Sequence, residues 1–95
     1  MAKRIRSGAV TTISDVVIQL LPANAERLCL IVQETGGTND FTFGDDADNV
    51  ADGFGIHVPA KSTIILDANA CPTGAIWAHF TTSGDATGVA HEIVP

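Results

Sequence analysis

The residues best suited to chemistry gather in the stretch FGDDADNVADG, residues 43–53, where four aspartates stand between two apolar runs. Carboxylates are the ligands that Ca²⁺ prefers, and an EF-hand-type loop places oxygen ligands at positions 1, 3 and 5, Gly at 6 and Glu at 12. With Asp46 at position 1, Asp48 fits position 3, but Val50 and Ala51 occupy positions 5 and 6. Frames that start at Asp40, Asp45 or Asp48 fail already at position 3 of the loop. We interpret the stretch as an acidic, solvated loop, with an irregular calcium site as the alternative.

A zinc site would need the cysteines and histidines to converge, and none of them stands at a spacing typical of zinc ligands. The candidates are Cys29, His57, Cys71, His79 and His91. Single histidines on strands favour surface or interface positions. We interpret the two cysteines as buried, reduced thiols of a protein assembled in a cytosol, with a disulfide as the alternative. The sequence thus predicts no metal and no other cofactor.

Motifs of nucleophilic catalysis do not occur in the sequence. It holds no G-x-S-x-G elbow, no catalytic cysteine motif and no paired carboxylates flanked by aromatic residues. Trp77 and His79 stand two residues apart on one face of an expected strand. Such a pair suits a sugar platform or a pH-sensitive contact, although packing is its commoner role. We predict that the protein is not an enzyme.

Charge and hydropathy exclude further classes of function. Eleven acidic residues against five basic ones give a net charge of −6, and a nucleic-acid-binding protein needs a basic face instead. No stretch approaches the roughly 18 uninterrupted apolar residues that a membrane span requires. The apolar run after the basic start is too broken by polar residues for a signal peptide. We expect a soluble protein that binds neither nucleic acid nor membrane.

The hydrophobic pattern divides the chain into short strands separated by Gly, Pro, Asn and Asp. Apolar, β-branched runs occur at 8–13, 15–21, 27–34, 41–44, 53–58, 62–67, 75–81 and 87–94. No convincing 3.6-residue pattern interrupts them. We therefore predict an all-β protein, a small antiparallel β-sandwich or jelly-roll-like barrel of seven to eight short strands. Periodicity fixes the faces of the strands and leaves their neighbours open.

Two segments carry more specific expectations. Residues 27–34 are apolar on both faces in their middle, which predicts a central strand covered on both sides. Residues 35–40 hold Gly, Asn and Asp, which are typical of tight turns, so we predict a hairpin that joins 27–34 to 41–44.

We divide the chain into a basic amino-terminal arm, residues 1–7, and a single β-sandwich domain, residues 8–95. Ninety-five residues provide one hydrophobic core but not two. Three of the five basic residues of the chain stand within four positions of the arm. Such a terminus is either a disordered end or a contact segment.

Several short stretches resemble a known class of virion proteins. They are LLPAN at 20–24, RLCLIVQETG at 27–36, FG at 43–44, GIHVPAKSTIILD at 55–67 and CPTGAIWA at 71–78. Their order is similar to that in small β-sandwich structural proteins of tailed bacteriophages, of the capsid decoration (cement) and head-fibre type. The resemblance covers residues 8–94. Its motifs are turn and core signatures, which specify a fold better than a role.

The resemblance implies a non-enzymatic virion structural protein that decorates and stabilises a bacteriophage capsid. Such a protein bridges subunits of the major capsid protein, often as a homotrimer at a local three-fold position. It would be made in the host cytoplasm and reside on the capsid surface. The segment expected to contact the capsid or a neighbouring copy consists of Lys3, Arg4, Ile5 and Arg6, with Ile5 as the apolar anchor. The acidic loop would face solvent.

Two other classes of function compete with this interpretation. The main alternative is a phage fibre-tip or tail receptor-binding module, which would bind carbohydrate through Trp77, His79 and loop carboxylates. A small hydrolase or metal enzyme is the third class, and it predicts a polar pocket or a bound metal. A carbohydrate binder needs an exposed aromatic platform, whereas a decoration protein needs a surface for its capsid.

Overall fold

The computed structural model describes residues 3–11, 16–36, 39–80 and 87–95, and these residues form eight strands and one short helix. The strands are β1 (Arg4–Thr11), β2 (Val16–Leu21), β3 (Cys29–Glu34), β4 (Phe41–Gly44), β5 (Ile56–Val58), β6 (Thr63–Leu66), β7 (Ile76–Phe80) and β8 (Thr87–Val94), and the helix is α1 (Ala47–Ala51). Seven of the eight runs predicted as strands each contain one strand, and the run 8–13 overlaps β1, which begins earlier, at Arg4. The parts of those runs at 12–13, 15 and 81 lie outside the described residues. The all-β prediction is confirmed.

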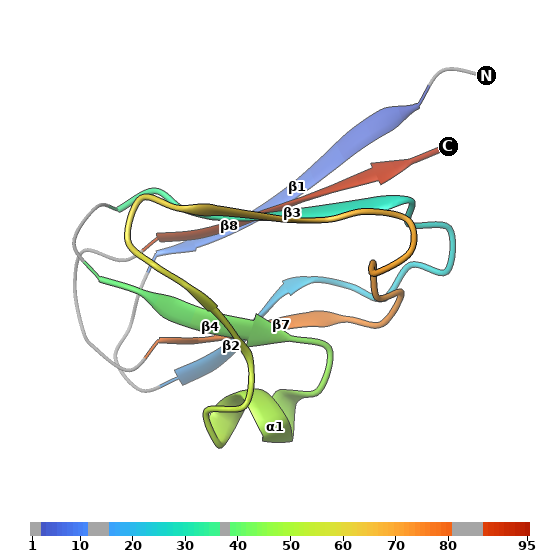
Figure 1. Ribbon diagram of the computed structural model, residues 1–95. Coiled ribbons are helices and arrows are strands. Elements are labelled where there is room, and N and C mark those ends of the chain that lie inside the picture. Colours follow the sequence, from blue (N-terminus) through green and yellow to red (C-terminus); the bar gives the residue numbers. More distant parts are fainter. Residues whose placement is uncertain (1–2, 12–15, 37–38, 81–86) are drawn as a thin grey trace.

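The strands form two four-stranded antiparallel sheets that face each other (Figure 1). Sheet A has the order β1-β8-β3-β6, and sheet B has the order β2-β7-β4-β5. The pairs β1·β8, β2·β7, β3·β6 and β4·β5 arise when a long antiparallel ribbon, with four strands in each arm, is rolled up. The pairs β3·β8 and β4·β7 then join the turns of the roll. This is the strand order of a jelly roll, so the predicted sandwich takes that form.

The core lies between the sheets and takes alternate residues from each strand. In β3, the inner residues Leu30 and Val32 are fully buried, whereas the outer residues between them are half-buried. The rings of Phe41 and Phe80, on the neighbouring strands β4 and β7 of sheet B, pack side by side in the core with centroids 4.9 Å apart. Residues 27–34 do contain a central strand, since β3 lies between β8 and β6. The expectation that both of its faces are covered is wrong, because only the inner face meets the core.

The predicted hairpin between residues 27–34 and 41–44 is also wrong. β3 pairs with β6 and β8 in sheet A, whereas β4 pairs with β5 and β7 in sheet B. The connection at 35–40, of which 37–38 lie outside the described residues, therefore joins one sheet to the other. Turn residues predict where a strand ends, but they do not select the partner of the next strand.

The acidic stretch contains a helix, which corrects the prediction of a plain loop. The Asp46 carboxylate caps α1 by accepting hydrogen bonds from the backbone N–H groups of Asp48 and Asn49, at 3.0 and 3.2 Å. Val50 is 1% exposed and packs on Gly44 of β4, where an added Cβ would lie 3.0 Å from it. The helix thereby covers part of the outer face of sheet B (Figure 1).

The residues expected to form a separate arm belong to a strand. Arg4 pairs with Val94 and Ile5 with Ile93, as the first pairs of the β1·β8 ladder. β3 begins opposite Ile93, at Cys29, so the end of the β1–β8 ribbon projects from the sandwich (Figure 1). Residues 1–2 lie outside the described residues. The strand continues through residue 8 without a break between arm and domain.

Gly8 marks a close approach of β1 to β2. A Cβ at this position would lie 2.1 Å from the backbone oxygen of Leu20, which has little room to move. We expect Gly8→Ala to lower the free energy of unfolding by about 3 kcal/mol in chemical denaturation. The control is Gly74→Ala, whose Cβ would make an ordinary contact of 3.7 Å with Asp45. Equal losses in the two variants would contradict the packing at Gly8.

Candidate functional site

One guanidinium group fastens the loops at one end of the sandwich. The side chains of Arg27 and Glu92 are 0% and 1% exposed, and Arg27 Nε donates to Glu92 Oε1 at 2.7 Å. Arg27 Nη1 donates to the carbonyl oxygens of Pro72 and Gly74, at 2.7 and 2.9 Å, and Nη2 to that of Pro22 at 2.8 Å. The LLPAN and CPTG stretches therefore meet around one buried cation, which holds the fold and has no access to a ligand.

The buried carboxylate of Glu34 binds the connecting segments at the other end of β3. Glu34 is 2% exposed, and its Oε1 accepts a hydrogen bond from the backbone N–H of Lys61 at 3.0 Å. Its Oε2 accepts from the N–H groups of Gly36 and Thr87, at 2.6 and 2.9 Å. Three connections between the sheets are thus tied to one side chain, and this charge too is structural.

The sugar platform expected at Trp77 and His79 is not open to solvent. Both residues lie on the outer face of β7, as their spacing predicts, in register with Gln19 and Val17 of β2. His79 is 9% exposed and Trp77 is half-buried. Because α1 packs against β7, the structure favours the packing interpretation of this pair.

The zinc candidates stay apart. His91 lies on the outer face of sheet A, whereas His57 and His79 share a cross-strand row of sheet B through Thr42. Within the described ranges, no group of three His, Cys, Asp or Glu side chains is placed to hold a metal ion.

Cys29 and Cys71 are free thiols, and both are half-buried. Burial raises the pKa of the Cys71 thiol, and the nearby charge of Arg27 opposes this effect only in part. The thiol is therefore less ionised at neutral pH than an exposed cysteine, which suits a packing role better than a nucleophilic one.

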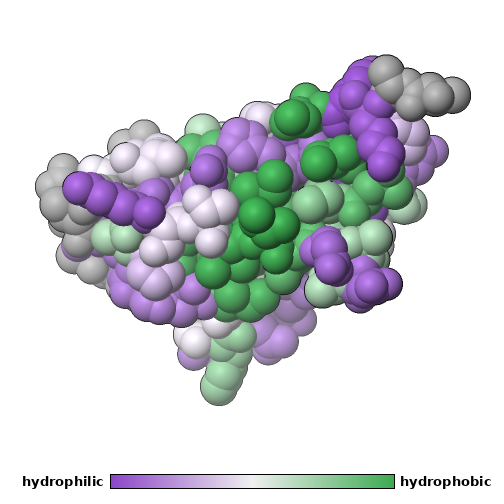
Figure 2. Space-filling model, turned by 45° about the horizontal axis from the view of Figure 1, so that its top comes forward, coloured by the Kyte–Doolittle hydropathy of each residue, from purple (hydrophilic) through white to green (hydrophobic). Residues whose placement is uncertain are grey.

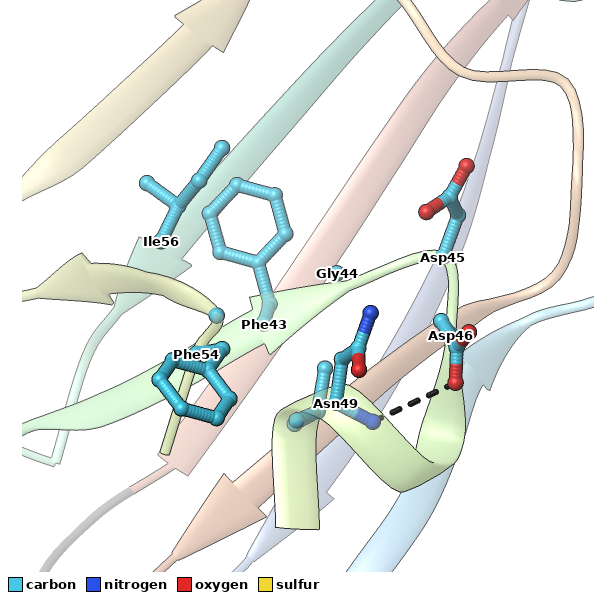
Figure 3. Close-up of a pocket in the computed structure, with 9 residues that line it drawn as sticks. Phe43, Gly44, Asp45, Asp46, Asn49, Phe54 and Ile56 are labelled. Carbon is cyan, nitrogen blue, oxygen red and sulfur yellow. Dashed lines mark hydrogen bonds between the residues drawn. The ribbon is translucent and has the colours of Figure 1, made fainter. Parts of the chain in front are cut away.

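A hollow of about 200 Å³ opens beside α1 (Figure 3). One side of it is apolar and is formed by Phe43, Phe54 and Ile56, and the other side carries Asp45, Asp46 and Asn49. Phe43 is buried, but Phe54 is 78% exposed and Ile56 is 44% exposed. This hollow could not be found from the strand pattern, in which Phe54 is only the start of a strand; the one signal in the sequence is an aromatic residue directly after Gly53.

The outer face of sheet A carries a second exposed apolar feature, the apolar strip, which consists of Cys29, Ile31, Ile65 and Ile93. Cross-strand register places Ile93 beside Cys29, and Ile31 beside Ile65. Ile65 is 63% exposed, and the other three are half-buried. In Figure 2, which turns the top of Figure 1 forward, apolar surface runs across this side of the molecule.

A row of polar side chains crosses the same face. Ser7 Oγ lies 2.6 Å from His91 Nδ1, and His91 Nε2 lies 3.0 Å from Gln33 Oε1. Gln33 Nε2 in turn donates to Thr63 Oγ1 at 3.3 Å. The tautomer with the proton on His91 Nε2 satisfies both contacts of the ring. This row links all four strands and holds the side chains flat against the sheet.

The outer face of sheet A is also free of acidic side chains among its described, outward-pointing residues. This lack of acidic side chains contrasts with the net charge of −6 of the whole chain. A partly apolar surface without acidic side chains is suited to a protein partner, because neither a desolvated carboxylate nor its repulsion opposes the contact.

The four residues predicted to contact a partner lie at the projecting end of β1, which we call the basic end: Lys3, Arg4, Ile5 and Arg6. All four are exposed, and Ile5 is 69% exposed. Arg4 Nε donates to the carbonyl oxygen of Pro95 at 3.3 Å, and Arg6 Nε lies 3.8 Å from Glu92 Oε2. The basic end is therefore held by β8 while its charges face solvent.

Comparison of the chain with protein-family models, with curated proteins and with solved structures finds no match. No helix in the described part of the chain is long and apolar enough to cross a membrane.

The Arg27–Glu92 pair generates a stability prediction. Arg27→Met removes the only buried counter-ion of the Glu92 carboxylate among the described residues and leaves the more distant, exposed Arg6, so we expect a loss of about 3–5 kcal/mol in denaturant unfolding. The control is Arg6→Met, whose exposed guanidinium lies 3.8 Å from the same carboxylate, and this variant should lose less than about 1 kcal/mol. Adding Glu92→Leu to Arg27→Met should recover part of the loss, and a double variant weaker than Arg27→Met would count against this account.

The cap of α1 generates another prediction. Asp46→Ala should cost about 1 kcal/mol of stability and speed hydrogen exchange at the Asp48 and Asn49 amides, because both N–H groups lose their acceptor. Asp45→Ala, which removes no cap, is the matched control and should change neither quantity. A melting temperature that rises with added calcium in the wild type would contradict the assignment of Asp46 to capping.

Proposed function

We propose that this protein is a non-enzymatic virion structural protein that decorates and stabilises a bacteriophage capsid by bridging subunits of its major capsid protein. The observation that carries the proposal is the outer face of sheet A, which is free of acidic side chains among its described residues and is crossed by the apolar strip. A contiguous exposed apolar surface of this kind is typical of a protein interaction site. The hollow beside α1, in contrast, is small and open for an enzyme pocket.

The resemblance of the LLPAN and CPTGAIWA stretches to phage decoration proteins supports the identity of the partner. Both stretches surround Arg27, so they belong to the part of the sequence that determines the fold. Jelly rolls are common among viral capsid and lectin domains. Because a fold by itself does not define a function, the surface of sheet A is the stronger support.

The proposed mechanism is a bridging contact. The apolar strip loses its water against the capsid, and the polar row of Ser7, His91 and Gln33 fixes the orientation by hydrogen bonds at the contact. A protein placed across the boundary between two capsid subunits must lose one contact before the subunits separate. Because many identical copies act on one particle, a modest free energy per copy stabilises the whole shell. In this proposal the protein acts as a homotrimer on the capsid surface.

A carbohydrate-binding fibre-tip or tail module is the second candidate, and one observation favours it. Phe54 is an exposed aromatic residue beside carboxylate and amide groups, as in many sugar sites. A glycan array separates the two candidates. Binding to sugars together with no binding to empty capsids would replace the decoration proposal.

The decoration proposal predicts that Ile65→Asp lowers occupancy of empty capsids at least about tenfold in co-sedimentation, because a carboxylate in the middle of the apolar strip must lose its hydration. Ala51→Asp adds the same charge at an exposed position of α1 and should bind like the wild type. Equal binding by the Ile65→Asp variant and the wild type would show that sheet A does not face the capsid.

A further inference from the structure

We infer that the basic end of one copy docks into the hollow beside α1 of a second copy, so that the protein assembles head to tail. This inference rests on the proposed function, since it names the contact that builds the proposed homo-oligomer. Both surfaces are present on every copy, and each has the chemistry that the other lacks.

The exposed apolar side chains lie in two places, on the outer face of sheet A and at the hollow. Among the described residues, four large apolar side chains are exposed: Ile5, Phe54, Ile56 and Ile65. Ile65 belongs to the apolar strip, which the proposed function assigns to the capsid. Ile5 lies beside Ile93 at the end of the apolar strip, near the amino-terminal end of β1, and is 69% exposed. Phe54 and Ile56 line the hollow (Figure 3). An exposed isoleucine near a strand end and a hollow with an apolar side are complementary in chemistry.

The distribution of charge supports the same contact between the basic end and the hollow. The basic end holds Lys3, Arg4 and Arg6, which are three of the five basic residues in the chain. Arg27 is buried against Glu92, so most of the accessible positive charge of the chain lies at this end. The hollow carries Asp45 and Asp46 on its polar side, and Asp48 and Asp52 are exposed nearby on the same helical segment. Opposite charges around an apolar centre favour association and fix its direction.

The basic end cannot fill the hollow of its own chain. Ile5 is held in sheet A by its pairing with Ile93, whereas the hollow lies on the other side of the sandwich, beneath sheet B (Figure 1). The occupant must therefore be a second copy. This pairing gives Asp45 and Asp46 a contact role in place of the solvent-facing role that the resemblance implied.

The contact joins two different surfaces, so it is heterologous and forms a ring if successive copies close. The basic end lies at one end of the sandwich, whereas α1, beside which the hollow lies, packs on sheet B (Figure 1). The two contact sites belong to different elements of the fold, and we infer that successive copies close into a small ring, the proposed homotrimer. One contact between a basic end and a hollow buries little surface. Closing the ring makes the assembly more stable, because the last contact forms between copies that are already joined.

Sedimentation velocity on the purified protein over a range of concentrations tests the inference without any capsid. We expect the wild type to self-associate, and the association to weaken as salt screens the charges. Ile5→Glu removes the apolar side chain that enters the hollow, and Phe54→Lys places a positive charge in the hollow. Each variant alone should therefore associate at least about tenfold more weakly. Ile65→Asp, an equally exposed isoleucine outside both surfaces, is the control and should associate like the wild type.

A mixture of the two variants gives the decisive result. The Ile5→Glu variant keeps an intact hollow and the Phe54→Lys variant keeps an intact basic end, so an equal mixture should form a one-to-one dimer and nothing larger. This dimer also shows that both variants are folded. A wild type that stays monomeric, single variants that still associate, or a mixture that stays monomeric would each overturn the inference. Because the Ile65→Asp variant tests capsid binding separately, failure of one proposal leaves the other distinguishable.

Discussion

The buried pair of Arg27 and Glu92 is the constraint on which the arrangement of the two sheets depends. Removing an ion pair from water is costly unless the remaining hydrogen-bonding capacity of both groups is used. Arg27 meets this requirement with backbone carbonyls from the two loops that cross between the sheets at this end, after β2 and before β7. Glu34 acts in the same way on the crossing connections at the opposite end of β3. The sandwich is therefore closed at both ends by charged side chains bound to backbone.

Because these charged side chains hold the sandwich together from inside, the outer faces of the two sheets are free to differ in their chemistry. α1 covers part of sheet B through Val50, and it brings the aspartates of the 43–53 stretch to the surface. Within the described ranges, no helix covers sheet A, and its polar row and apolar strip form a surface whose described outward-pointing side chains are not acidic. Sheet A, the basic end and the hollow differ in chemistry. Under the proposed function, they serve contacts with different neighbours.

The strands could be predicted because their signal is local: β-branched residues alternate within each run, and turn residues separate the runs. The hairpin prediction failed because pairing depends on the whole roll and not on residues 35–40. A five-residue helix is too short for a periodic pattern, although Asp46 before it is a typical N-cap. Glu34 and Glu92 did carry a signal, since each stands in phase with the buried residues of its strand, such as Val32 and Ala90. Their partners are distant in sequence, so a single sequence does not identify them.

The pairing of β1 with β8 also determines when the molecule can finish folding. Arg4 meets Val94 in the first pair of that ladder, so β1 has no strand to pair with in sheet A until β8 has been synthesised. β8 also lies between β1 and β3, and sheet A therefore cannot form on the ribosome before this segment emerges. Contacts so distant in sequence are slow to form. Without β8 the basic end has no ladder to hold it, so the conformation of this end depends on a segment that is distant in the sequence.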